Sequence, residues 1–470
     1  MKEVKRMKHI IALTTLVVVV VTLTWTTIGL AEDDKVDKIL DLLKKKGIIN
    51  EEEYKSIKHE IDEEGKNDVI AVFDKGFKMR TRDKKFEIGV GGRFQFDFRG
   101  YNSGHPENNT FDVRRIRAEL FGRLYEYFKF KTEWELEGGN ASNRLRDGYM
   151  EYDYFKNAVV RLGQFKEPFS MEEVTSDNNT VFLERSLNNA LVPSRDVGVM
   201  IYGNPFAERL HYEVGVFNGN GVDANGEDND DKDVALRLVM SPFITTNSIF
   251  KELHFGGAFT YGHEDDETLS ARSEAFTKYF EFKDVDTDTR TRLGGELNWL
   301  VGPFTLMGEY IRAKYEDLEG KVEVPYAILY RSLLGGKGQV EIDDTANIDS
   351  WYVMTTYCLT GEKRSYKNRA LSNITPKNNF DFQKRTWGAW ELALRYARFD
   401  ADDDFFDSGI VKPEYSRKAE SFNFGINWFL NPNVLVKTNY VHTDFDTNLV
   451  KEGKELENED VFLMRFQLVY

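Results

Sequence analysis

The chain has 470 residues, with 63 Lys or Arg against 79 Asp or Glu, and its formal net charge is −16. This acidic balance disfavours nucleic acid as a partner, and a single cysteine excludes an intramolecular disulfide framework and paired CxxC zinc sites. Aromatic residues make up 14% of a chain whose mean hydropathy is only −0.51. That combination is typical of β-rich proteins, including barrels with aromatic girdles, which place their apolar residues in alternation.

The N-terminus has the pattern of an export signal. Residues 1–9 carry four Lys or Arg, an apolar run follows at 10–31, and Gly29 and Ala31 place small residues at the −3 and −1 positions. The pattern predicts a secretory signal peptide, residues 1–31, cleaved after Ala31, with an uncleaved membrane anchor as the alternative. The remaining sequence has no apolar run of about 18 residues, so no helix there can span a bilayer. An exported chain with almost no cysteine indicates a Gram-negative cell envelope protein.

Residues 32–68 differ from the rest of the chain because their apolar residues recur at helical spacing. Gly47 is suited to end a first helix, and Asn50 with Glu53 is suited to cap a second. These residues predict a short periplasmic helical hairpin ahead of a barrel domain at 69–470. A partly ordered leader is the alternative.

From residue 86 onward, apolar and polar residues alternate. In 86-FEIGVGGRFQFDFRGY-101, one face carries Phe94, Phe96 and Phe98, and the other carries Arg93 and Asp97. Successive strand side chains point to opposite faces, so this stretch is a two-faced strand. Sixteen such strands are predicted, at residues 86–101, 113–124, 128–136, 145–155, 158–166, 196–203, 208–218, 233–242, 252–262, 290–300, 303–315, 349–360, 386–398, 417–429, 433–444 and 460–470.

The connections between these strands differ in length. Short ones lie at 125–126, 156–157, 301–302 and 431–432, and long hydrophilic ones lie at 167–195, 219–232, 263–289, 316–348, 361–385 and 445–459. Short periplasmic turns with long outside loops are typical of outer-membrane barrels. The sequence therefore predicts a sixteen-stranded antiparallel outer-membrane β-barrel, with apolar faces in lipid and charged faces lining water. A β-rich cell-surface binding protein without transport is the alternative from another class.

Four segments resemble the phosphate-selective porin O and P family. The longest is 163–199, which begins GQFKEPF, contains FLERSL and ends in RDVGV, and the others lie at 359–366, 388–396 and 427–434. The resemblance implies a homotrimeric porin for small anions, chiefly phosphate, with one long loop folded inward as a constriction. By position this loop is 167–195. Glu184, Arg185 and Arg195 are its expected anchors.

In that family an arginine ladder guides anions down the lumen. Arg holds phosphate with forked donors and keeps its charge. The matching pore-lining candidates are Arg93, Arg99, Arg115, Arg117, Arg123, Lys129, Lys131 and Lys166, with Arg237, Arg292, Arg395, Lys437 and Arg465 on later inward faces.

Acidic residues share these inward faces. They are Glu87, Asp97, Glu119, Glu133, Glu135, Glu137, Glu151, Glu296 and Glu391. Carboxylates beside arginines produce neutral ladders, so a general or weakly cation-preferring porin remains open beside the phosphate channel. Outer-membrane lipid and lipopolysaccharide are the other expected partners.

Catalytic patterns are not found in the sequence. Its seven histidines show no metal-ligand spacing, and it has no GxSxG elbow or Walker loop. We expect no enzyme activity, no cofactor and no metal site.

Overall fold

The computed structural model describes residues 40–47, 49–64, 69–73, 76–137, 144–219, 221, 231–321, 339–367, 370–451 and 453–470. The predicted signal peptide lies outside these residues. The chain forms two compact units, one made of its part up to Gly91 together with 120–128, and one made of 92–119 with 129–470. The helices in the described part of the chain fall short of the length and apolarity that crossing a bilayer requires.

The first unit contains the predicted helical hairpin. A helical turn at 40–45 is followed by α3 (Glu51–Glu64), and Gly47 between them has a φ of +68°, the left-handed conformation that favours glycine. The Asn50 side chain accepts a hydrogen bond from the Glu53 N–H at 2.9 Å, and the Glu53 carboxylate accepts one from the Asn50 N–H at 2.8 Å. This reciprocal capping box confirms the predicted helix start. The periplasmic location of the segment remains a prediction.

A hairpin absent from the predicted strands follows in the same unit. It consists of β1 (Val69–Phe73) and β2 (Phe77–Thr81), and β2 pairs antiparallel with the first residues of β3, Phe77 opposite Val90. Alternation did not identify β1, because 69-VIAVF-73 is apolar throughout.

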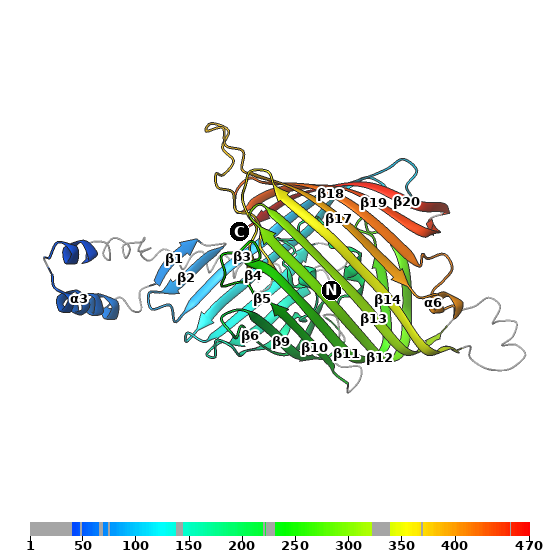
Figure 1. The fold of residues 1–470 in the computed structure, drawn as a ribbon, viewed down its shortest axis with the longest axis horizontal. Helices are drawn as coiled ribbons and strands as arrows, with labels where there is room; N and C mark the ends of the chain where they lie inside the picture. Colours follow the sequence, from blue (N-terminus) through cyan, green and yellow to red (C-terminus); the bar gives the residue numbers. More distant parts are fainter. Residues whose placement is uncertain are drawn as a thin grey trace, which may run out of the picture. The chain divides into compact units, whose positions relative to one another are not determined.

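The predicted sixteen-stranded antiparallel barrel is confirmed (Figure 1). β20 pairs with β3 from Val461↔Tyr101 to Val469↔Arg93, which closes the sheet. Closure satisfies every backbone donor and acceptor within the sheet, as hydrocarbon requires. The strands are β3 (Glu87–Tyr101), β4 (Thr110–Leu124), β5 (Phe128–Glu137), β6 (Arg144–Tyr152), β7 (Val159–Lys166), β8 (Arg195–Gly203), β9 (Leu210–Phe217), β10 (Asp233–Met240), β11 (Glu252–Arg272), β12 (Lys278–Val301), β13 (Phe304–Lys321), β14 (Gln339–Cys358), β17 (Ala389–Ala401), β18 (Lys418–Phe429), β19 (Val434–Lys451) and β20 (Lys454–Val469).

The strands have an apolar outer face and a polar inner face. On β8, Val197, Val199 and Ile201 are exposed, whereas Asp196 is buried. An exposed apolar band of this kind suits contact with lipid acyl chains.

Further from the short turns, partly exposed positions of the outer face carry ion pairs. Arg312 pairs with Asp349 at 2.7 Å, and Arg398 pairs with Glu420 at 2.8 Å. Because charged side chains are costly in hydrocarbon, these pairs mark the level of the polar headgroups.

Two predicted outer loops, 263–289 and 445–459, are largely strand, and a third, 316–348, begins and ends in strand. The paired strands β11 and β12 extend through most of 263–289, β13 and β14 extend into 316–348, and β19 and β20 meet within 445–459. The acidic composition of these segments indicated loops. Their backbone groups nevertheless pair across extended hairpins, because a strand outside the bilayer tolerates polar side chains on its outer face.

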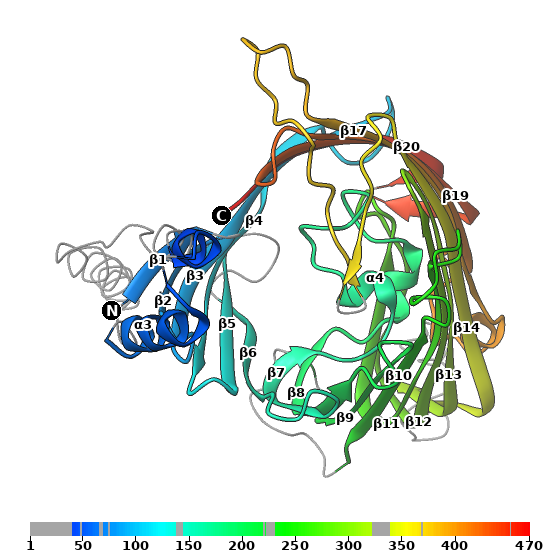
Figure 2. The same cartoon turned by 60° about the vertical axis from the view of Figure 1, so that its left-hand side comes forward.

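The segment between β14 and β17 was assigned to the wrong end of the barrel. The predicted outside loop 361–385 belongs to a connection at 359–388 that leaves the same end as the turns at 302–303 and 430–433. It carries the short pair β15 (Tyr366–Lys367) and β16 (Ala370–Leu371). The alternation of short turns and long loops is therefore not strict, and the part of this connection that carries β15 and β16 lies inside the ring of strands beside α4 (Figure 2).

We expect Arg364→Ala to destabilise the barrel. Arg364 donates to both oxygens of Glu391 at 2.6 Å, and both side chains are 1% exposed. Losing one partner leaves a buried charge uncompensated, at a cost of about 3–5 kcal/mol. The temperature at which the folded form is lost on SDS gels measures the change. Lys363→Ala, at the exposed neighbouring position, is the control, and equal melting of both variants would contradict the expectation.

Candidate pore constriction

The connection between β7 and β8, residues 167–194, folds into the barrel as predicted for the constriction loop. It contains the short helices α4 (Met171–Val174) and η2 (Leu187–Leu191). Figure 2 shows α4 inside the ring of strands. Phe169, Phe182 and Leu187 are each at most 1% exposed and belong to the largest apolar cluster. Apolar packing therefore fixes the body of the loop against the wall.

Glu309 on β13 holds the start of α4. Its carboxylate accepts hydrogen bonds from the backbone N–H groups of Met171, at 3.1 Å, and Glu172, at 2.7 Å. The Tyr352 hydroxyl donates to the same carboxylate at 2.8 Å, and Arg395 donates to the Glu172 side chain at 3.1 Å. Glu309 was not among the predicted site residues, because its role depends on a loop distant in sequence.

Three further strands hold the middle of the loop through its backbone. The contacts are Lys437 to the carbonyl of Thr180 at 2.5 Å, Asn427 to the carbonyl of Val181 at 3.0 Å, the N–H of Leu183 to Asn439 at 2.7 Å, and Arg465 to the carbonyl of Leu183 at 2.7 Å. These donors and acceptors lie on β18, β19 and β20. Lys437 and Arg465, predicted to face the lumen, therefore lie beneath the loop rather than along open water.

Glu184 connects the loop to two parts of the wall. Its carboxylate accepts from Arg114 at 2.9 and 3.1 Å and from Arg465 at 2.8 Å, with Arg115 at 4.0 Å. Both Arg114 and Arg115 contact lumen groups although they are consecutive, so the alternation of β4 is interrupted there. This interruption is why Arg114 was absent from the predicted set.

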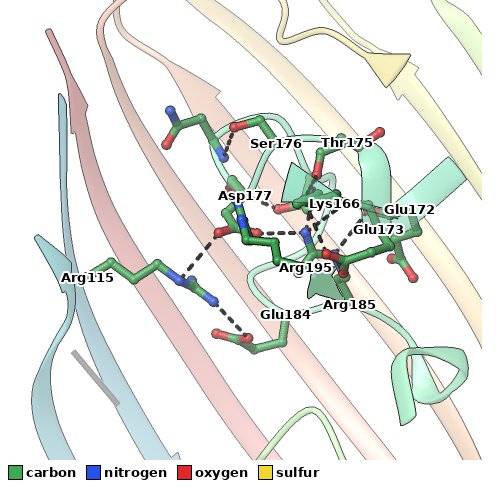
Figure 3. A network of polar contacts seen from close by, with 12 residues as sticks. Arg115, Lys166, Glu172, Glu173, Thr175, Ser176, Asp177, Glu184, Arg185 and Arg195 are labelled. Atoms are coloured by element: carbon green, nitrogen blue, oxygen red, sulfur yellow. Dashed lines mark hydrogen bonds and ion pairs between the residues drawn. The ribbon is translucent and has the colours of Figure 1, made fainter. Parts of the chain in front are cut away.

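Asp177 is a loop carboxylate that lies close to several wall arginines, of which Figure 3 shows Arg115. It lies 3.0 Å from Arg117, 3.6 Å from Arg115 and 3.8 Å from Arg93, and it accepts from Arg185 of its own loop at 2.7 Å. Burial disfavours the charged form of Asp177. The guanidinium groups of Arg115, Arg185 and Arg117 outweigh that effect and hold the pKa of this loop carboxyl well below its usual range.

The same arginines also have carboxylate partners on the wall. Arg93 donates to Glu133 at 2.6 Å, and Arg117 donates to Glu135 at 2.6 Å and to Glu133 at 3.1 Å. Predicted inward acids and inward bases therefore meet as ion pairs.

The other predicted site residues are distributed over several places. Six of them form ion pairs: Lys131 with Asp147 at 3.0 Å, Lys166 with Glu173 at 3.4 Å, Arg195 with Asp147 at 2.6 Å, Arg99 with Asp112 at 2.8 Å, Lys129 with Asp153, and Arg185 with Glu173 at 3.2 Å. Arg123 belongs to the other compact unit, where it donates to the carbonyl of Glu126 at 2.5 Å. Arg185 thus braces its own loop. Arg195 links β8 to β6.

Arg146 on β6 was absent from the predicted set, because alternation from the inward Glu151 places it on the outer face. It interacts electrostatically with Arg195, Arg117, Asp177 and Glu135, which places it beside the constriction. Among the described residues its Nε is buried without a hydrogen-bond partner. Its charge is therefore less completely matched than those of its neighbours.

Two other segments enter the lumen. The tip of the β11–β12 hairpin places Glu274 against Arg395 at 3.0 Å and against Ser421 at 3.0 Å. From the opposite end, the connection at 359–388 reaches the constriction loop. Its contacts are Leu371 N–H to the Thr175 hydroxyl at 3.1 Å, Asn373 to the carbonyl of Asn178 at 2.6 Å and Arg364 to the carbonyl of Asn179 at 3.5 Å. The constriction is thus formed by three segments, which are the loop at 167–194, the tip of the β11–β12 hairpin and the connection at 359–388.

Comparison with known proteins gives consistent results. The model of the family described as phosphate-selective porin O and P matches residues 88–470. Porin O of Pseudomonas aeruginosa is 24% identical over 446 residues, which cover 86% of this chain and 93% of that protein. OmpT of Vibrio cholerae has a TM-score of 0.50 at 11% identity, over 82% of this chain and 98% of that one. The outer membrane channel DcaP of Acinetobacter baumannii also has a TM-score of 0.50, at 12% identity, over 83% of this chain and 99% of that one.

We expect Glu184→Ala to loosen the constriction loop. The change removes the Glu184 carboxylate that accepts from Arg114, and it leaves Arg465 with Asp97 as its remaining carboxylate partner. We expect this loss to weaken the attachment of the loop to the wall by about 3 kcal/mol. Single-channel recording in planar bilayers is expected to show a larger and noisier conductance. Glu420→Ala, which removes an ion-paired glutamate from the outer face, serves as the control. A conductance unchanged from the wild type would contradict the anchoring role.

Proposed function

The chain belongs to the phosphate-selective porin O and P family, and from this premise we propose that it passes small anions, with inorganic phosphate as the candidate solute. It is an outer-membrane porin of the Gram-negative cell, built as a sixteen-stranded barrel. We propose passive diffusion through a water-filled lumen, with no catalytic step, cofactor or metal.

The observation that carries the proposal is the convergence of Arg93, Arg115 and Arg117 on the constriction loop. These guanidinium groups lie within 3.0–3.8 Å of one loop carboxylate, so they face the narrow part of the lumen together. Guanidinium groups stay charged and present forked donors that match oxyanions. Basic side chains at a constriction are what an anion pore needs, provided that binding stays weak enough for release.

The ion pairs favour a second candidate, a general or weakly cation-preferring porin. Arg117 has Glu133 and Glu135 as partners, and Lys131 contacts both Glu119 and Asp147. Each such pair removes net positive charge from the passage. The net charge of the groups left unpaired therefore determines which candidate is correct.

We further propose the assembly and surroundings. Family membership supports a homotrimer, and the exposed apolar band supports contact with outer-membrane lipid, including lipopolysaccharide in the outer leaflet. We propose a signal peptide at 1–31, cleaved after Ala31, a periplasmic helical segment at 32–68 and the barrel domain at 69–470.

Replacing Arg115 and Arg117 together by Ala tests the proposed anion preference. Each lost charge near the passage lowers the advantage of an anion by about 1 kcal/mol, or roughly fivefold in permeability ratio. The reversal potential in a KCl gradient is therefore expected to shift toward cations.

The matched control is the double change Arg312→Ala and Arg398→Ala, which removes the same charge from the outer face. It is expected to leave the reversal potential unchanged. Wild-type cation preference, or chloride current that phosphate does not block, would overturn the anion assignment.

A further inference from the structure

We propose that Asp177 acts as a built-in anion, occupying the place among the constriction arginines that a permeating oxyanion would take, and so sets the anion affinity of the pore. This inference rests on the proposed function, because it assumes that small anions pass the constriction. It assigns Asp177 a role in specificity rather than only in holding the loop.

The geometry around Asp177 is that of an occupied oxyanion site. Its Oδ2 faces Arg117 on β4 at 3.0 Å, Arg115 on β4 at 3.6 Å and Arg93 on β3 at 3.8 Å, while its Oδ1 accepts from Arg185 at 2.7 Å. Four guanidinium groups from two strands and a loop thus surround one carboxylate that is 6% exposed. Such a cluster presents the donors that a phosphate oxyanion accepts.

Arg115 is the arginine most affected by this arrangement. Its other partners are the Gln95 side chain, an uncharged acceptor at 3.0 Å, and Glu184 at 4.0 Å. Arg93 and Arg117, in contrast, have wall carboxylates at 2.6 Å. Without the Asp177 charge, Arg115 would be the guanidinium left to bind a passing anion.

Arg146 strengthens the same conclusion. It interacts electrostatically with Asp177, and its buried Nε has no hydrogen-bond partner among the described residues. The charge of Asp177 therefore offsets two incompletely matched arginines, Arg115 and Arg146.

The backbone that carries Asp177 is held independently of its carboxylate. The carbonyl of Asn178 accepts from Asn373 at 2.6 Å and from Gln467 at 3.0 Å, and the carbonyl of Thr180 accepts from Lys437 at 2.5 Å. The N–H of Asn179 donates to the carbonyl of Ser176 at 2.7 Å, and this hydrogen bond closes a turn that contains Asp177. Replacing the carboxylate by an amide of the same shape is therefore expected to change the charge while keeping the path of the loop.

The test is Asp177→Asn in the full-length channel, with phosphate block of chloride current as the readout. Removing one negative charge 3–4 Å from the arginines is expected to lower the phosphate concentration for half block by about tenfold. It is also expected to shift the reversal potential toward anions.

Glu420→Gln is the matched control. It removes one negative charge from the ion pair with Arg398 on the outer face, away from the constriction arginines. We expect half block within twofold of the wild type.

A second variant separates the charge effect from a displaced loop. Arg115→Gln in the Asp177→Asn background is expected to return the phosphate concentration for half block to near the wild-type value. The reason is that this second change removes the arginine whose charged partner was lost in Asp177→Asn. Unchanged or weaker block in Asp177→Asn, or a gain that Arg115→Gln does not reverse, would overturn the inference. A wild-type channel that prefers cations would contradict the proposed function rather than this inference. In that case the difference in reversal potential between the wild type and Asp177→Asn still tests the role of Asp177.

Discussion

The need to satisfy backbone hydrogen bonds inside a lipid bilayer determines the rest of this structure. Hydrocarbon offers no partner for an open strand edge, so β3 and β20 must pair and close the sheet. Once the sheet is closed, the pleat sends every second side chain outward, where only apolar groups are tolerated. At the level of the hydrocarbon, the charged residues of the sixteen strands therefore lie on the inner face.

Crowding these charges into one lumen requires that they neutralise one another. Arg237, Arg395 and Arg465 are each at most 1% exposed and contact carboxylates. Removing one partner of such a buried pair destabilises the fold by more than the pair itself stabilises it, because the remaining charge stays buried without a partner. Most lumen arginines therefore stabilise the wall and the inserted segments, and only the incompletely matched ones are available to solute.

Local alternation was sufficient to predict the barrel and much of its inner face. It predicted all sixteen strands and the inward positions of Arg93 and Asp97, since a regular strand needs no information from elsewhere. It failed where the pleat is interrupted, as at Arg114, and where the role of a residue depends on a distant segment, as for Glu309. The connection at 359–388 was misplaced because its length resembles that of an outer loop.

Counting inward arginines cannot decide selectivity, because the decisive quantity is the difference between positive groups and the carboxylates within their reach. That difference depends on the loop as much as on the wall. Asp177 reaches Arg93, Arg115 and Arg117 only because the loop crosses the lumen and is held by strands on its far side. The net charge of −16 describes the whole chain, whereas a permeating ion responds to charges within a Debye length, about 8 Å at physiological salt. An acidic protein can therefore contain an anion-selective passage, and the position of one loop carboxylate is enough to strengthen or weaken it.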